Sequence, residues 1–108
     1  MPSRIKVLVV VSDLAALSRV YLALLHKNYR TEATDKSEGI TERIKRMKPS
    51  VIVLGMKEYQ TIKNVLKIPA VLLVDPEEEI NFLPGDIIPV QKPFTIQTLI
   101  RSVESRII

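Results

Sequence analysis

The chain of 108 residues contains no cysteine, and it has only one histidine and three glycines. Without cysteine it forms neither a disulfide framework nor a thiolate metal site, which suits a reducing compartment such as the cytosol. A single histidine cannot supply the paired spacing of zinc proteases, and three scattered glycines make no glycine-rich phosphate loop. No arrangement of serine, histidine and aspartate points to nucleophilic catalysis either, so none of these common signatures of enzyme sites is present.

Long apolar runs are also missing. The segment closest to the N-terminus that is continuously apolar has five residues, Val7 to Val11, and it stops at Ser12. Such a run is too short for the core of a signal peptide and far too short to span a bilayer. We therefore expect a soluble cytoplasmic protein that does not act at a membrane.

Charge of one sign does not dominate the chain. Sixteen basic and twelve acidic residues give a net charge of +4. The only dense basic group is Arg43, Lys45, Arg46 and Lys48, at an expected helix C-terminus, where the helix dipole favours cations. Recognition of nucleic acid needs basic residues clustered with a reading element. A solvated helix end is favoured over a phosphate-binding patch, and nucleic acid is not an expected partner.

Short apolar runs alternate with segments in which apolar residues recur at helical spacing. Continuous apolar runs bounded by turn signals are typical of strands buried on both faces, and the 3.6-residue period is typical of amphipathic helices. The pattern predicts strands at 4–11, 30–34, 50–55, 69–74 and 86–90, and helices at 12–29, 37–48, 58–67 and 95–108.

Alternating strands and helices predict a single α/β domain over residues 1–108, with a parallel, doubly wound sheet covered on both faces. The polar strand at 30–34 fits an edge better than the centre. Pro89 cannot donate a hydrogen bond to a neighbouring strand, so the fifth strand also belongs at an edge. The connections at 56–68 and 76–85 have thirteen and ten residues, so the third helix should be trimmed and the fourth reduced to a turn or lost.

Five segments in order carry a family resemblance. They are "KVLVVVSD", "NYRTEAT", "KPSVIVLG", "IPAVLLV" and "KPF". Over essentially its whole length the chain resembles the receiver domain of two-component response regulators. The resemblance implies a flavodoxin-like five-stranded parallel sheet in the order 2-1-3-4-5, here with shortened third and fourth helices.

The resemblance also implies a phosphorylation site, from which this chain departs. Gly55 stands where the family has its phosphorylated aspartate, and Val11 and Ser12 stand where an acidic pair holds magnesium. Val74 replaces the serine or threonine that ends the fourth strand. Glycine offers no nucleophile and valine offers no oxygen to a magnesium ion, so the resemblance implies a scaffold without the phosphorylation chemistry.

Lys92 alone matches the family's site, and Asp13 falls one residue after the acidic pair. Pro89 stands in place of the family's aromatic switch residue. Because Asp13 and Asp75 both follow strands at the same edge of the sheet, we expect one of them to pair with Lys92. Either aspartate by itself would hold a cation only weakly.

We therefore interpret the chain as a pseudo-receiver, which is a non-catalytic, phosphorylation-independent signalling module that works through protein–protein interaction and needs no cofactor. Two alternatives remain open. One is a phosphoacceptor that uses a displaced acid, Asp13 or Asp75. The other is a small-ligand binder, because open α/β sheets bind ligands at the carboxyl ends of their strands.

The interaction surface is expected at the rim formed by the fifth strand and the last helix, and a homodimer is expected to form there. The first helix is a competing surface, because its leucines at positions 14, 22 and 25 fall partly outside the core stripe. The residues predicted for the rim are Phe82, Leu83, Ile88, Ile96 and Ile100.

Overall fold

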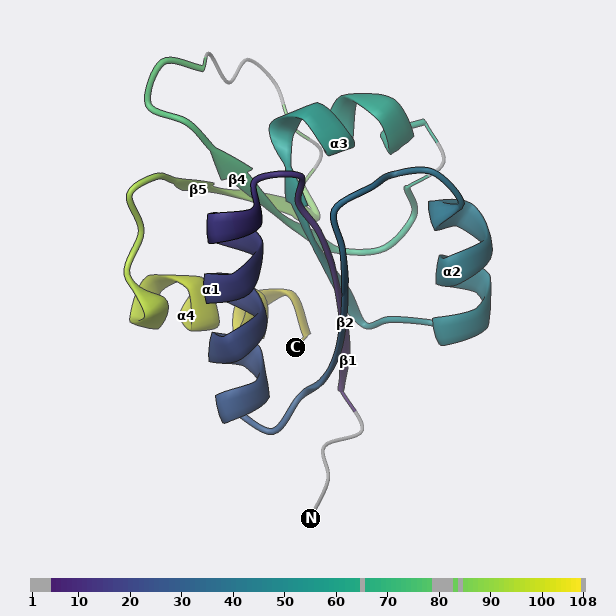
Figure 1. Ribbon diagram of the computed structural model, residues 1–108, viewed down its shortest axis with the longest axis horizontal. Coiled ribbons are helices and arrows are strands. Elements are labelled where there is room, and N and C mark those ends of the chain that lie inside the picture. The colour runs from purple at the N-terminus through teal and green to yellow at the C-terminus, as the bar shows by residue number, and fades with distance from the viewer. Residues whose placement is uncertain (1–4, 65, 79–82, 84, 108) are drawn as a thin grey trace.

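The computed structural model describes residues 5–64, 66–78, 83 and 85–107. Five parallel strands form one sheet in the order β2-β1-β3-β4-β5 (Figure 1), which confirms the predicted flavodoxin-like topology. The strands are β1 (Lys6–Val10), β2 (Arg30–Thr34), β3 (Val51–Gly55), β4 (Ala70–Val74) and β5 (Ile87–Gln91). The helices are α1 (Leu14–His26), α2 (Ile40–Met47), α3 (Met56–Ile62) and α4 (Ile96–Ile107).

The three central strands carry the continuous apolar runs. Every residue of β3 and β4 is buried, as are the last four residues of β1. The polar strand β2 lies at one edge, with Arg30 and Glu32 exposed, and β5 lies at the other edge with Pro89 exposed. Both predicted edge positions are thus confirmed.

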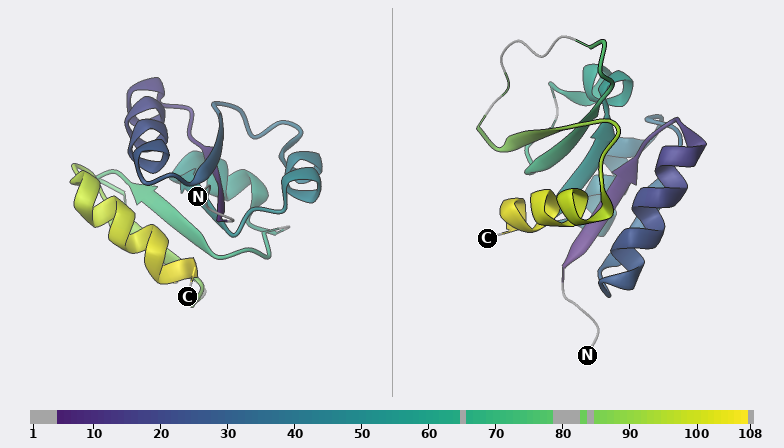
Figure 2. Two further views of the ribbon diagram at one scale, coloured as in Figure 1. Left: turned by 90° about the horizontal axis from the view of Figure 1, so that it is seen from below. Right: turned by 90° about the vertical axis from the view of Figure 1, so that its left-hand side faces the viewer.

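Helices cover both faces of the sheet (Figure 2). Alternate residues of each strand point to opposite faces, so Val7 and Val9 pack under α1 and α4, whereas Leu8 and Val10 pack under α2 and α3. The two resulting cores are each closed by helix residues, Leu24 and Leu99 on the first face and Ile40 and Tyr59 on the second.

Local signals in the sequence set the helix ends. The Asp13 carboxylate accepts hydrogen bonds from the backbone N–H groups of Ala15 and Ala16, so it caps α1. Thr95 Oγ1 accepts a hydrogen bond from the N–H of Thr98 at 3.0 Å at the start of α4, as its position before the helix predicts. At the end of α2, Lys48 adopts a left-handed conformation with φ 53° directly before Pro49.

The prediction for the third helix was wrong in its bounds. It was expected at 58–67, but α3 occupies Met56–Ile62 and starts directly after β3. Its buried residues are Glu58, Tyr59 and Ile62, so a glutamate takes part in the inward face. An apolar stripe was expected at Ile62, Val65 and Leu66; Leu66 is partly buried, and Val65 lies outside the described residues.

The connection from β4 to β5 shows no helix in its described residues, 75–78, 83, 85 and 86. This agrees with the expectation of a single turn or none. Among the helices of the described ranges, none has the length and apolar character needed to cross a membrane.

Candidate functional site

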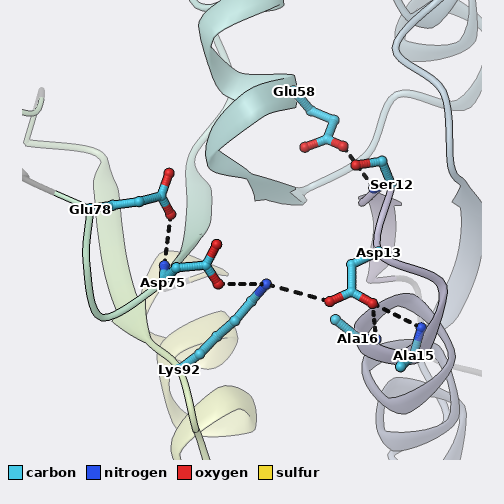
Figure 3. A network of polar contacts seen from close by, with 8 residues as sticks. All are labelled: Ser12, Asp13, Ala15, Ala16, Glu58, Asp75, Glu78 and Lys92. Carbon is cyan, nitrogen blue, oxygen red and sulfur yellow. Dashed lines mark hydrogen bonds and ion pairs between the residues drawn. The ribbon is translucent and has the colours of Figure 1, made fainter.

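The chain segments that leave four strands meet at the carboxyl edge of the sheet. Asp13 follows β1, Gly55 ends β3, Asp75 follows β4 and Lys92 follows β5. Because parallel strands present all their carboxyl ends at one edge, residues far apart in sequence lie together there. Figure 3 shows Lys92 between the carboxylates of Asp13 and Asp75.

Lys92 forms ion pairs with both aspartates. Its Nζ lies 3.2 Å from Asp75 Oδ1 and 3.9 Å from Asp13 Oδ2. Its backbone N–H donates to the carbonyl of Val74 at 2.7 Å, which holds the segment after β5 against the end of β4. The expected pairing is confirmed, with two partners where one was predicted. Both carboxylates are about half exposed, so each pair contributes about 1 kcal/mol or less.

The two aspartates also have structural tasks. Besides pairing with Lys92, Asp13 caps α1 through Oδ1, which lies 3.1 Å from the N–H nitrogen of Ala15. Behind Asp75, the chain turns so that the Asp75 N–H donates to Glu78 Oε1 at 2.7 Å. The turn formed by residues 75–78 is therefore held by a hydrogen bond within itself.

Glu58 is the site residue that sequence reasoning missed. It lies in the first turn of α3, and only 5 % of its surface is exposed. Its Oε1 accepts a hydrogen bond from the backbone N–H of Ser12 at 2.7 Å, which connects the start of α3 to the end of β1 (Figure 3). A carboxylate is thus buried at the same strand edge, supplied by a residue outside the positions that the resemblance marks.

The Glu58 carboxylate lies where a side chain at position 55 would begin. A Cβ added to Gly55 would be 2.5 Å from Glu58 Oε2. Gly55 itself has φ −79° and ψ 163°, an extended conformation that any residue adopts. Glycine therefore leaves room for the Glu58 carboxylate, which a side chain at position 55 would oblige to move, and no positive φ calls for glycine here. The sequence does contain a signal for this contact, because a glutamate stands three residues after the glycine that ends a strand. It was missed because the helix that contains this glutamate was predicted to start too late.

The residues at the edge do not fit the magnesium ion that the resemblance implies. Val11 and Val74 are buried apolar side chains without ligand atoms. Magnesium needs several hard oxygen ligands in near-octahedral order. Across the described ranges, no group of three histidine, aspartate or glutamate side chains could hold a metal ion.

A polar hollow of about 250 Å³ lies beside Glu58. It is bordered by the end of β1, the segment before α2 and the outer side of α3. Cations and anions are nearly balanced in its lining, which consists of Ser12, Asp35, Lys36, Ser37, Glu38, Lys57, Glu58 and Thr61. This is the place on the carboxyl edge where the small-ligand alternative has physical room.

The rim residues predicted for interaction differ in their exposure. Ile96 is 40 % exposed, whereas Ile100 is 8 % exposed and belongs to the core under α4. Leu83 and Ile88 are partly buried against the two cores. Phe82 lies outside the described residues. Of these five positions, Ile96 is therefore the one whose described side chain is clearly open to a partner.

Solved structures with the same fold are response-regulator receiver domains. The N-terminal domain of the nisin resistance regulator NsrR superposes with a TM-score of 0.78 at 16 % identity, covering 98 % of this chain and 100 % of that one. A receiver domain protein from Bacillus halodurans C-125 superposes with a TM-score of 0.75 at 13 % identity, covering 98 % of this chain and 97 % of that one. NtrX from Brucella abortus, solved with ADP, gives 0.78 at 18 % identity, covering 99 % of this chain and 26 % of NtrX.

These identities are low. No protein-family model matches the chain, and no curated protein matches it significantly. The agreement in strand order, together with superposition over nearly the whole chain, gives the conclusion that this chain has the fold of response-regulator receiver domains.

Proposed function

We propose that this chain is a pseudo-receiver: a cytoplasmic, non-catalytic signalling module that works through protein–protein contacts without being phosphorylated. The observation that carries the proposal is the Glu58 carboxylate, which fills the space at Gly55. A phosphoacceptor needs a nucleophile with room in front of it for the incoming phosphoryl group. At this position the nucleophile is missing and its space is filled.

The remaining acids at the edge support the same proposal. Asp13 is engaged by the N-terminus of α1 and by Lys92, and Asp75 is engaged by Lys92. Glu58 accepts the Ser12 N–H and is almost completely buried. For Glu58 to serve as a displaced phosphoacceptor, its buried carboxylate would first have to become accessible. Asp13 and Asp75 are half exposed but are held in place beside Lys92.

The test is treatment with a small phosphodonor and magnesium, followed by intact mass measurement. We expect no mass gain of one phosphoryl group, while a receiver domain that retains its aspartate gains one under the same conditions. A stable gain would overturn the proposal and favour the displaced-acid alternative. The variants Asp13→Asn, Asp75→Asn and Glu58→Gln would then identify the acceptor, because only the variant of the true acceptor stays unmodified.

Two additions belong to this proposal. Self-association at the β5–α4 rim is consistent with β5 being an edge strand and with the exposure of Ile96.

The polar hollow beside Glu58 favours, as a second candidate, a small polar ligand that regulates the module. A ligand that raises the melting temperature of the chain, but not that of a Thr61→Arg variant, would support this second candidate.

A further inference from the structure

The large apolar side chains that are exposed lie on two neighbouring helices. Within the described residues, they are Leu14, Leu22 and Leu25 of α1 and Ile96 of α4, each at least 40 % exposed. The two helices cover the same face of the sheet and contact each other (Figure 2). Two of the four, Leu22 and Ile96, line one groove between the helices, whereas Leu25 lines a separate hollow beside β2. Contiguous exposed apolar side chains mark an interaction surface more often than scattered ones do.

Between these helices lies an apolar groove of about 420 Å³, here called the α1–α4 groove. Its floor is made by Leu22 and Ala23 from α1 and by Ile96 and Ile100 from α4. Ala23 and Ile100 are buried, whereas Leu22 and Ile96 are 55 % and 40 % exposed. The groove therefore has a rigid floor rooted in the core and two large side chains that a partner can cover.

The border of the α1–α4 groove is basic. Arg19, His26 and Lys27 complete its lining, which includes no acidic residue. Within the described ranges, neither Arg19 nor Lys27 makes a salt bridge. The guanidinium carbon of Arg19 lies 5.2 Å from the centroid of the buried Phe94 ring, a cation–π distance that positions this charge beside the groove.

We propose that the α1–α4 groove binds an acidic amphipathic helix of a partner protein. A helix laid into an apolar groove buries residues spaced i, i+3, i+4 and i+7, and its flanking carboxylates would meet Arg19 and Lys27. This inference rests on the proposed function as an interaction module, and it adds the surface and the chemistry of the partner.

The size and the charge of the groove argue for this occupant. On the α1 side the lining runs from Arg19 to Lys27, about 12 Å along the helix, so the groove can face about two turns of another helix, the span of residues i to i+7. A second copy of the chain in a two-fold pair would place the same basic border against itself. That like-charge contact disfavours the copy and favours a partner of opposite charge.

The experiment is a selection from a displayed peptide library. Each peptide spans about four helical turns, with fixed leucines at helical spacing and randomised polar positions, and the full chain is the target. We expect the enriched peptides to be rich in aspartate and glutamate and poor in lysine and arginine. Binding of one enriched peptide is then measured by fluorescence anisotropy, with its glutamates changed to lysines as the charge control.

Variants of the chain connect the binding to the groove. Leu22→Glu and Ile96→Glu should each weaken the peptide at least about ten-fold, because they place a charge on the apolar floor. Lys27→Glu should weaken it several-fold, and this effect should shrink at high salt. Leu25→Glu is the matched control, since Leu25 lies on the same helix, is 40 % exposed as Ile96 is, and is not part of the groove lining.

Several results would overturn the proposal. They are the absence of any enrichment, enrichment of neutral or basic peptides, or binding that Leu22→Glu and Leu25→Glu weaken equally. Dimerisation of the chain that Leu22→Glu abolishes would assign the groove to a second copy. The proposed function is tested separately: a chain inert to phosphodonors that selects no acidic helix overturns only this groove, whereas a chain that becomes phosphorylated overturns only the pseudo-receiver assignment.

Discussion

The carboxylate of Glu58 occupies the space that a side chain at position 55 would need. Glu58 Oε2 lies 2.5 Å from the ideal Cβ position, and Glu58 Oε1 accepts the N–H of Ser12. The glycine and the glutamate therefore form one unit, in which the absence of one side chain permits the position of the other. This coupling gives the first prediction at the residue scale.

Gly55→Ala should lower the free energy of unfolding by about 1 kcal/mol, because Glu58 must move and the hydrogen bond to Ser12 is lost. In a Glu58→Ala background the same substitution should be neutral or stabilising by a few tenths of a kcal/mol, since the backbone conformation at 55 is ordinary and alanine restricts the unfolded chain. Denaturant unfolding of the four proteins in a double-mutant cycle measures the coupling. Additive effects would show that Glu58 does not depend on the glycine.

The sequence predicted where a single residue lies when that residue stands shortly after the end of a strand. Asp75 and Lys92 come directly after strands of a parallel sheet, and Asp13 lies between β1 and α1, so their meeting at one edge could be derived before the structure. Glu58 could not be found in this way. It lies inside a helix and reaches back to the strand end, and a buried glutamate goes against the usual exposure of its residue type.

At the scale of elements, the strands were easier to predict than the helices. The buried strands are continuous apolar runs ended by polar residues or by glycine, so their bounds are readable. The bounds of α3 were not, because its inward face combines Glu58, Tyr59 and Ile62, whereas the expected stripe was Ile62, Val65 and Leu66. The packing of the helix start against Ser12 determines where α3 begins, and no local propensity encodes that contact.

A hydrogen bond connects the segment between α1 and β2 to helix α4, and its donor is a titratable tyrosine. Tyr29, 9 % exposed, donates its hydroxyl to Glu104 Oε2 at 3.0 Å across 75 residues of sequence. Burial raises the pKa of Tyr29, and the hydrogen bond to Glu104 and the charge of that carboxylate raise it further. Because the pKa is raised in the folded state, the stabilisation is complete below the ordinary tyrosine value of 10.0 and is lost as the pH rises through the folded-state pKa.

We therefore expect the free energy of unfolding to fall as the pH increases above 10.0. Tyr29→Phe should cost about 1 kcal/mol near neutral pH through the lost hydrogen bond, and it should flatten the decline at high pH. Glu104→Gln should lessen the decline without removing it, because the burial of Tyr29 remains. Urea unfolding at a series of pH values measures both effects, and an equal decline in the wild type and Tyr29→Phe would contradict the assignment.

At the scale of the whole molecule, the sequence predicted the arrangement of the sheet and the exposure of Leu14, Leu22 and Leu25 on the first helix, but it did not predict the burial of Ile100. Alternation and right-handed crossovers predict a doubly wound parallel sheet, and the polar segment 30–34 and Pro89 mark its two edge strands. The order of the strands was implied by the family resemblance and is confirmed. Exposure of a helix face depends on what packs across it. The last helix was expected to offer Ile96 and Ile100 together, but Ile100 turns into the core, and the open apolar side chains lie mainly on α1.

The oligomeric state is the last prediction, and it concerns the β5–α4 rim. The edge strand β5 carries a partly buried Ile88, and the described residues between β4 and β5 add no helix to cover that side. Pairing of two copies through this rim should give twice the 12.2 kDa mass of one chain in light scattering at micromolar concentration.

Ile100→Glu is not a useful probe of this pairing, because it should cost at least about 3 kcal/mol by placing an unpaired charge in the core. Leu83→Glu should reduce the mass to that of one chain, and Leu22→Glu, in the α1–α4 groove, should leave it unchanged. A wild-type chain that stays monomeric would contradict pairing at the rim, and a dimer that Leu22→Glu alone dissociates would move the contact to α1.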